Sequence, residues 1–81
     1  MYRGKTIGVV VPAYNEELLI GKVIKNMPAY VDKVYVVDDC STDKTISVVR
    51  SERDFRVVIQ RHKINLGVGA AIVTGYRRAL Q

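Results

Sequence analysis

The stretch that decides the fold is Lys33-Val34-Tyr35-Val36-Val37-Asp38-Asp39-Cys40-Ser41. Its first five residues predict a short β-strand, and the valines make that strand apolar enough to be buried. Two aspartates follow the strand directly. Ser41 then provides a side chain that can cap a helix, which we expect to extend to about Glu52. The stretch therefore predicts a strand, a polar loop and a helix in that order.

The same alternation occurs before and after this unit. Residues 6–11 form an apolar run that we expect Pro12 to end, and residues 19–27 carry apolar side chains at helical spacing. Asn15 is the expected N-cap of that helix, with Glu16 in its first turn, where the helix dipole favours acids.

A third strand and a third helix complete the pattern. Residues 56–60 are rich in β-branched side chains, and residues 68–79 carry an apolar stripe with a period of 3.6 residues. Gly75 lies within that stripe, and because glycine destabilises a helix, it predicts close packing of the helix on the sheet. Three strand–helix units with short connections predict a three-layer α/β fold with an open parallel sheet (β-α-β-α-β-α).

Length and composition bound the possible functions. The 81 residues allow one small domain, and an apolar fraction of 48% is typical of a packed one. No apolar run approaches the roughly 20 residues that span a bilayer, and the N-terminal run is too short for a signal peptide. The single cysteine, Cys40, fits a reducing compartment. We therefore expect a cytoplasmic location, and a position at the cytoplasmic face of the membrane stays open.

The chain is basic. Thirteen Lys and Arg against eight Asp and Glu give a formal net charge of +5. This charge fits either an ordinary solvated surface or an anionic partner, such as nucleotide phosphates or an acidic membrane surface. Because no aromatic residues interleave with the bases and no RNA-binding signature is present, we expect no nucleic acid partner.

A polar cluster follows each predicted strand, at residues 12–16, 38–43 and 61–69. The carboxyl ends of parallel strands share one edge of the sheet, where open α/β sheets bind ligands, so the clusters predict one crevice. Structural alternatives stay open for all three. In these alternatives the role of each cluster is purely structural. The first cluster caps a helix, the second forms a turn, and the glycines of the third permit a tight turn.

The residue types favour a nucleotide as the ligand. The ring of Tyr14 can lie against a planar base, and the carboxylate of Glu16 can accept hydrogen bonds from ribose hydroxyls. Asp38 and Asp39 are neighbours on a strand and point to opposite faces, so we expect one to orient its loop and the other to face the crevice. His62 has no His or Cys partners at the spacing of a metal site.

Two other nucleotide or phosphate folds fit the motifs poorly. A dinucleotide-binding G-x-G-x-x-G loop would follow the first strand, and Ile72 occupies the position of its last glycine in the only similar segment. A receiver-like phospho-acceptor domain carries its paired acids after the first strand, whereas here they follow the second.

Taken together, residues 9–16, residues 36–45 and residues 65–71 with Gly75 resemble glycosyltransferase family 2. The similarity is nearest to the branch of dolichyl-phosphate mannose or glucose synthases. It implies the nucleotide-binding half of an A-type glycosyltransferase fold. It also implies transfer of a hexose from a UDP- or GDP-sugar to a polyprenyl phosphate. A non-catalytic nucleotide-binding fragment is the alternative.

The resemblance also implies a set of nucleotide-binding residues and no catalytic residue within the chain. In the family, the residue at Asp39 contacts the base and the residue at Asp38 is its structural neighbour. The full set is Pro12, Ala13, Tyr14, Glu16, Asp38, Asp39, Asn65 and Gly67.

The family's D-x-D motif, which holds Mg²⁺ or Mn²⁺, is expected after a fourth strand, beyond Gln81. We therefore expect residues 1–81 to form one half-domain that does not transfer sugar alone. In the family the first strand pairs with the fourth. Without that partner, the edge at residues 6–11 predicts self-association.

Overall fold

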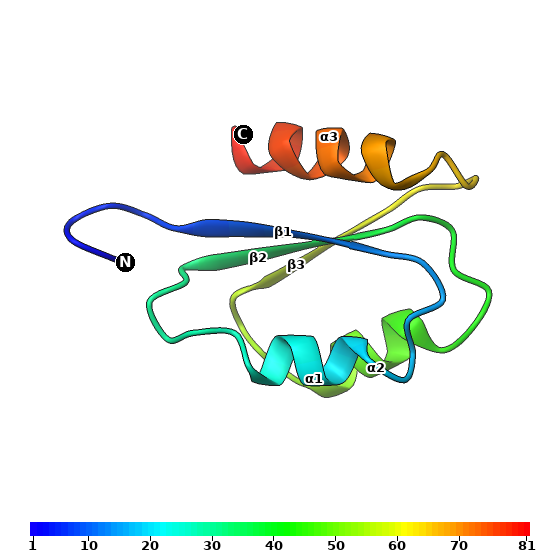
Figure 1. Ribbon diagram of the computed structural model, residues 1–81, viewed down its shortest axis with the longest axis horizontal. Coiled ribbons are helices and arrows are strands. Elements are labelled where there is room, and N and C mark those ends of the chain that lie inside the picture. Colours follow the sequence, from blue (N-terminus) through cyan, green and yellow to red (C-terminus); the bar gives the residue numbers. More distant parts are fainter.

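Three parallel strands form the middle layer of the computed structural model, which describes residues 1–81. They are β1 (Gly8–Ala13), β2 (Lys33–Asp38) and β3 (Val57–Arg61), in the spatial order β1-β2-β3. Helices α1 (Ile20–Lys25) and α2 (Thr45–Ser51) cover one face of the sheet, and α3 (Val68–Ala79) covers the other (Figure 1). The predicted three-layer α/β fold is confirmed.

The central strand β2 carries the core. Val34, Val36 and Val37 are completely buried, as a strand with neighbours on both sides and helices on both faces requires. Val34 and Val36 belong to one apolar cluster with residues from α1 and α2, including Ile24 and Val49. Burying each such side chain contributes about 2 kcal/mol, and β2 contributes more buried apolar side chains than any other element.

Gly75 lets α3 pack closely on β1. A Cβ atom added at Gly75 would lie 2.3 Å from Cγ1 of Val10, far inside van der Waals contact. Gly75 is one of the two buried residues of α3. The predicted close approach of helix and sheet is thus confirmed. None of the three helices combines the length and apolar character needed to cross a bilayer.

The expected N-cap at Asn15 is wrong. Asn15 has a φ of 51°, and its Oδ1 accepts a hydrogen bond from the backbone N–H of Thr42 at 2.9 Å. A turn follows, in which the N–H groups of Leu19 and Ile20 donate to the carbonyl of Glu16. Helix α1 begins only at Ile20 because Asn15 is bound to the next loop rather than to the helix.

The expected cap at Ser41 is also wrong. Its hydroxyl bonds the carboxylate of Asp38 and accepts from the N–H of Asn15 at 2.9 Å. Helix α2 begins at Thr45, whose N–H donates to Asp43 at 2.9 Å. Ser41 thus joins two loops, and Asp43 lies where the helix starts.

Strand β1 continues through Pro12, which we expected to end it. Pro12 pairs with Val37, and Ala13 pairs with Asp38. Proline is tolerated in a strand at the edge of a sheet, where its missing N–H faces away from the neighbouring strand. The position of β1 at an unpaired edge therefore explains why the strand ends two residues later than the sequence predicts.

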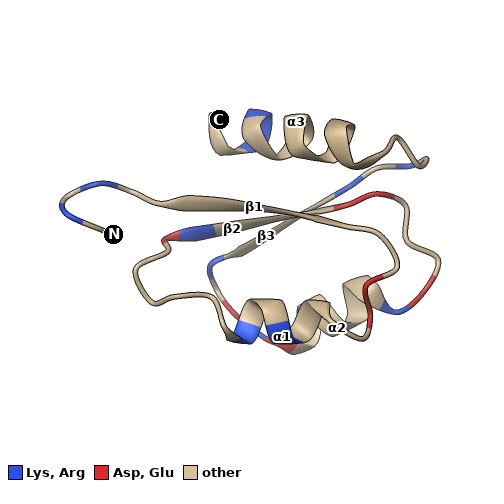
Figure 2. Cartoon of the chain, viewed as in Figure 1, with Lys and Arg blue, Asp and Glu red and all other residues tan.

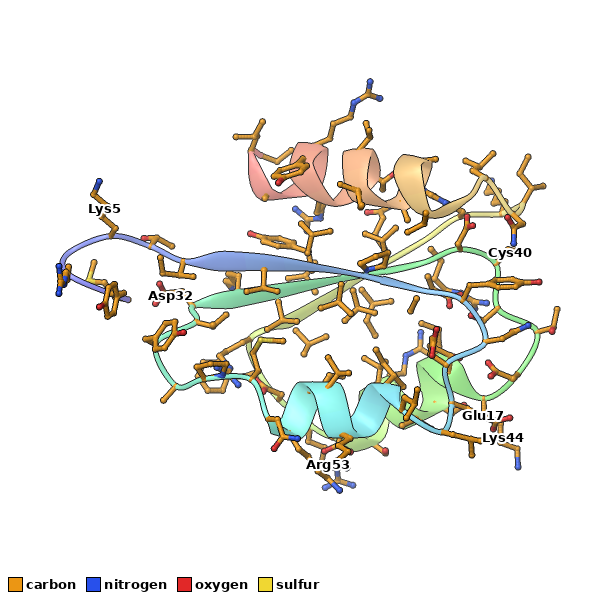
Figure 3. All side chains as sticks on the ribbon, in the orientation of Figure 1. Lys5, Glu17, Asp32, Cys40, Lys44 and Arg53 are labelled. Atoms are coloured by element: carbon orange, nitrogen blue, oxygen red, sulfur yellow. The ribbon has the colours of Figure 1, made fainter.

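Two acidic residues fasten the amino end of the sheet, opposite the end that carries Cys40 (Figure 3). Asp32 accepts from the N-terminal amine at 2.6 Å and from the N–H of Ile7 at 2.7 Å. Asp54 pairs with Arg56 at 2.8 Å, and the same guanidinium donates to the carbonyl of Pro28 at 2.7 Å. The hydrogen bond from the N-terminal amine lowers the pKa of Asp32, and the one from Arg56 lowers the pKa of Asp54.

We expect Gly75→Ala to lower the free energy of unfolding by about 1–3 kcal/mol, because its methyl group collides with Val10. Alanine is otherwise the better helix former. Gly69→Ala, in the same helix, is the control, since a Cβ there meets no atom within 4 Å. Urea denaturation measures both. A Gly75→Ala variant as stable as the parent would refute the close packing.

We expect acid to weaken the fold through these carboxylates. Because the folded pKa of Asp54 lies below its ordinary value of 3.8, its stabilisation is complete well above that pH and disappears as pH falls through the folded pKa. Asp54→Asn should therefore be less stable than the parent at pH 7, and the difference should shrink as pH falls below 3.8 toward the folded pKa of Asp54. Thermal melts across this range test the expectation. A constant difference between the two proteins would contradict it.

Candidate functional site

The loops that follow the three strands meet at one edge of the sheet, as the sequence predicts. The N–H of Asp39 donates to the carbonyl of Ala13, and the N–H of His62 donates to the carbonyl of Asp38, both at 2.8 Å. Acidic residues of the first two loops gather at this end of the molecule (Figure 2). The three polar clusters therefore surround one region.

A pocket of about 250 Å³ opens between these loops and the start of α3. Its lining residues are Pro12, Ala13, Tyr14, Glu16, Asp39, Val68 and Ala71. Five of them belong to the set that the sequence singles out. Its volume is close to the lower end of the range for small-molecule sites, and apolar and polar side chains are mixed in its walls.

Sequence reasoning missed Val68 and Ala71. Both belong to the apolar stripe of α3, which predicts core positions. Ala71 is buried while Val68 is largely exposed, so the stripe passes from the pocket wall into the core along the helix. The spacing alone does not distinguish these two surroundings.

Asp39 lines the pocket and also anchors the loop before α3. Its Oδ1 accepts from Nδ1 of His62 and from the N–H of Leu66, and its Oδ2 accepts from the N–H of Gly67, all at 2.8 Å. The hydrogen bond from His62, helped by those from the two amides, lowers the pKa of Asp39 against the effect of burial. The carboxylate is therefore ionised at neutral pH.

Asp38 faces away from the pocket. It is completely buried, and its carboxylate binds the hydroxyl and N–H of Ser41 and pairs with Nε of Arg61 at 3.3 Å. The two aspartates thus point in different directions, as expected for neighbours on a strand. Both orient loops, and only Asp39 also reaches the pocket.

Tyr14 and Glu16 bring accessible groups to the pocket. The side chain of Tyr14 is half exposed. The backbone N–H of Glu16 donates to Oγ1 of Thr45 at 2.8 Å, which fixes the backbone, while the carboxylate of Glu16 forms no ion pair. Glu16 therefore offers a carboxylate that the fold itself does not use.

Asn65 and Gly67 do not line the pocket. Asn65 is exposed in the loop before α3. Gly67 has a φ of 93°, which side chains rarely allow, and no atom would lie within 4 Å of an added Cβ. The glycine is thus required by the turn itself. The tight turn that the glycines of this cluster could permit is therefore present at Gly67.

The chain offers no ligand set for a metal ion. Residues 1–81 contain no group of three or more His, Cys, Asp or Glu side chains close enough together to hold one. In the pocket, the carboxylate of Asp39 already accepts three hydrogen bonds from the protein. Residues 1–81 therefore contain no metal site built from three or more of these side chains.

Other proteins are similar to this chain in sequence and in fold. An uncharacterized protein of Methanocaldococcus jannaschii is 45% identical over 75 residues, which cover 91% of this chain and 30% of that protein. The UDP-N-acetylglucosamine–dolichyl-phosphate N-acetylglucosaminyltransferase of Methanococcus voltae is 30% identical over 92 residues, which cover 95% of this chain and 37% of that enzyme. The chain therefore spans about a third of the length of these relatives.

A solved structure supports the same relationship. The mannosyltransferase of Pyrobaculum calidifontis in complex with GDP-Man and Mn²⁺ superposes with a TM-score of 0.81 at 32% identity, over 89% of this chain and 24% of that one. The family model of glycosyl transferase family 2 matches residues 8–81. The chain belongs to glycosyl transferase family 2.

Proposed function

We propose that the pocket binds the nucleotide of a nucleoside-diphosphate sugar, and that these residues serve a glycosyltransferase. The observation that carries the proposal is the pocket itself, where an aromatic ring, an unpaired carboxylate and an apolar wall surround one volume. Membership of glycosyl transferase family 2 supports it. The similarities to the Methanococcus voltae and Pyrobaculum calidifontis enzymes point the same way.

Each wall of the pocket suits one part of a nucleoside. The ring of Tyr14 and the side chains of Val68 and Ala71 provide apolar surface for a base. The carboxylate of Glu16 is a suitable acceptor for ribose hydroxyls. Asp39 has about four acceptor positions, of which three are occupied, so one remains for an N–H of the base.

The proposal also names a class of donor and a class of acceptor. The two named relatives differ in base and sugar: one is named for UDP-N-acetylglucosamine, and the other is bound to GDP-Man. We propose a UDP- or GDP-hexose as donor. The acceptor is a polyprenyl phosphate, as the dolichyl phosphate in the name of the Methanococcus voltae enzyme suggests.

We also propose that a divalent metal ion takes part in the transfer. The Pyrobaculum calidifontis enzyme is in complex with Mn²⁺, and a divalent cation beside a diphosphate would neutralise charge on the departing nucleotide. Because residues 1–81 hold no ligand set, the metal would be bound by residues outside this segment. The segment would seat the base and the ribose.

A non-catalytic nucleotide-binding role is the second candidate. It requires the pocket but no metal-binding residues. Release of free nucleotide from UDP- or GDP-sugar in the presence of polyprenyl phosphate and Mn²⁺ distinguishes the two when the protein tested also contains the metal-binding residues expected beyond residue 81. Nucleotide binding without transfer by these 81 residues is expected under both.

We also propose that the unpaired edge of β1 mediates self-association. The backbone of Gly8 to Val11 presents N–H and C=O groups to one side with no strand beside it, and Pro12 removes only one donor. Light scattering should show a molecular mass that rises with concentration. A mass that stays at that of one chain, 9.1 kDa, up to millimolar concentration would refute this proposal.

We expect Glu16→Gln to weaken the binding of UDP or GDP by about tenfold, or about 1.4 kcal/mol. The variant keeps the shape of the side chain but removes the charge that strengthens hydrogen bonds from ribose. Isothermal titration calorimetry measures the effect.

Glu17→Gln is the matched control. It removes the same charge at the adjacent residue, which does not line the pocket. Equal loss in both variants would indicate a long-range charge effect. Unchanged binding in Glu16→Gln would remove Glu16 from the site.

A further inference from the structure

The chain's single histidine is buried next to the pocket and is hydrogen-bonded at both ring nitrogens. The side chain of His62 is 8% exposed. Its Nδ1 lies 2.8 Å from Oδ1 of Asp39, and its Nε2 lies 2.7 Å from Oγ1 of Thr74 in α3. The ring thus connects the pocket carboxylate to the middle of the helix that covers the sheet.

The chemistry of Asp39 fixes the direction of these hydrogen bonds. Asp39 accepts from the backbone N–H groups of Leu66 and Gly67, and an ionised carboxylate can only accept. Nδ1 of His62 must therefore carry a proton. In the neutral ring Nε2 is then an acceptor, and the hydroxyl of Thr74 donates to it. One chain of hydrogen bonds runs from Thr74 through His62 to Asp39.

This arrangement determines which oxygen of Asp39 is available to a ligand. Oδ1 accepts from His62 and from the N–H of Leu66, so both of its lone pairs are occupied. Oδ2 accepts only from the N–H of Gly67 and keeps one acceptor position. Without the ring, one of the two donors on Oδ1 is lost, and the carboxylate is held only by the N–H groups of Leu66 and Gly67.

We propose that His62 is a positioning residue for nucleotide binding: it holds the carboxylate of Asp39 so that one acceptor position of Oδ2 serves an N–H group of the base. The inference rests on the proposed function. His62 acts through Asp39 and does not itself line the pocket. A role limited to filling the core would not depend on which ring nitrogen is replaced.

Two substitutions separate the ring nitrogens. In His62→Asn the side-chain amide nitrogen takes the position of Nδ1. The variant can therefore still donate a hydrogen bond to Asp39, but it loses the hydrogen bond with Thr74. In His62→Gln the side-chain amide takes the position of Nε2. The variant therefore keeps the hydrogen bond with Thr74 but loses the one with Asp39. Both remove the ring, which makes each the control for the packing effect of the other.

The experiment combines titration of the 81-residue chain with UDP and with GDP, thermal melts, and NMR of the ring and amides. We expect His62→Asn to bind within about threefold of the parent and His62→Gln to bind about tenfold more weakly. We also expect the Leu66 amide to exchange faster in His62→Gln only. Equal binding by both variants, or affinities that follow only their melting temperatures, would overturn the proposal.

NMR separates this inference from the proposed function. If the parent binds neither UDP nor GDP, the proposed nucleotide function fails for these residues. The positioning of Asp39 is still tested, because the ring nitrogen shifts of His62 report the tautomer. A neutral ring protonated on Nε2, or equal exchange of Leu66 in both variants, would show that His62 does not hold the carboxylate.

Discussion

The structure depends on two buried carboxylates at the end of its central strand. A buried charge is unfavourable unless it is hydrogen-bonded, so Asp38 and Asp39 must draw donors from whatever lies nearby. Asp38 binds Ser41, whose hydroxyl also accepts from the loop after β1, and pairs with Arg61 at the end of β3. Asp39 binds the loop before α3. These two residues therefore hold all three loops at one edge.

The same interactions form the pocket and limit its chemistry. Because Asp39 satisfies two backbone amides and a histidine, most of its acceptor capacity supports the fold. Glu16 differs, since its carboxylate has no ionic partner and the hydrogen bond that fixes its position uses its backbone. The site thus contains one carboxylate held by the protein and one free for a ligand. A nucleoside, with donors on both its base and its ribose, matches that division.

Family membership and the geometry of the site support each other at different levels. The family model covers residues 8–81 and establishes the family. The relatives from Methanocaldococcus jannaschii and Methanococcus voltae are about three times longer than this chain. The geometry explains which task these residues can perform by themselves. They line an apolar and acidic pocket of about 250 Å³, and they contain no group of three or more metal-ligating side chains.

The sequence by itself determined the alternation of strands and helices, the shared edge of the three polar clusters and the close packing at Gly75. These follow from local periodicity and from the geometry of parallel sheets. Only the tertiary structure decided the partners of the polar side chains. Asn15 and Ser41 bind the neighbouring loop instead of capping helices, and His62 meets Asp39 across 23 residues of sequence. Such partners depend on distances between segments far apart in the chain, which no local pattern encodes.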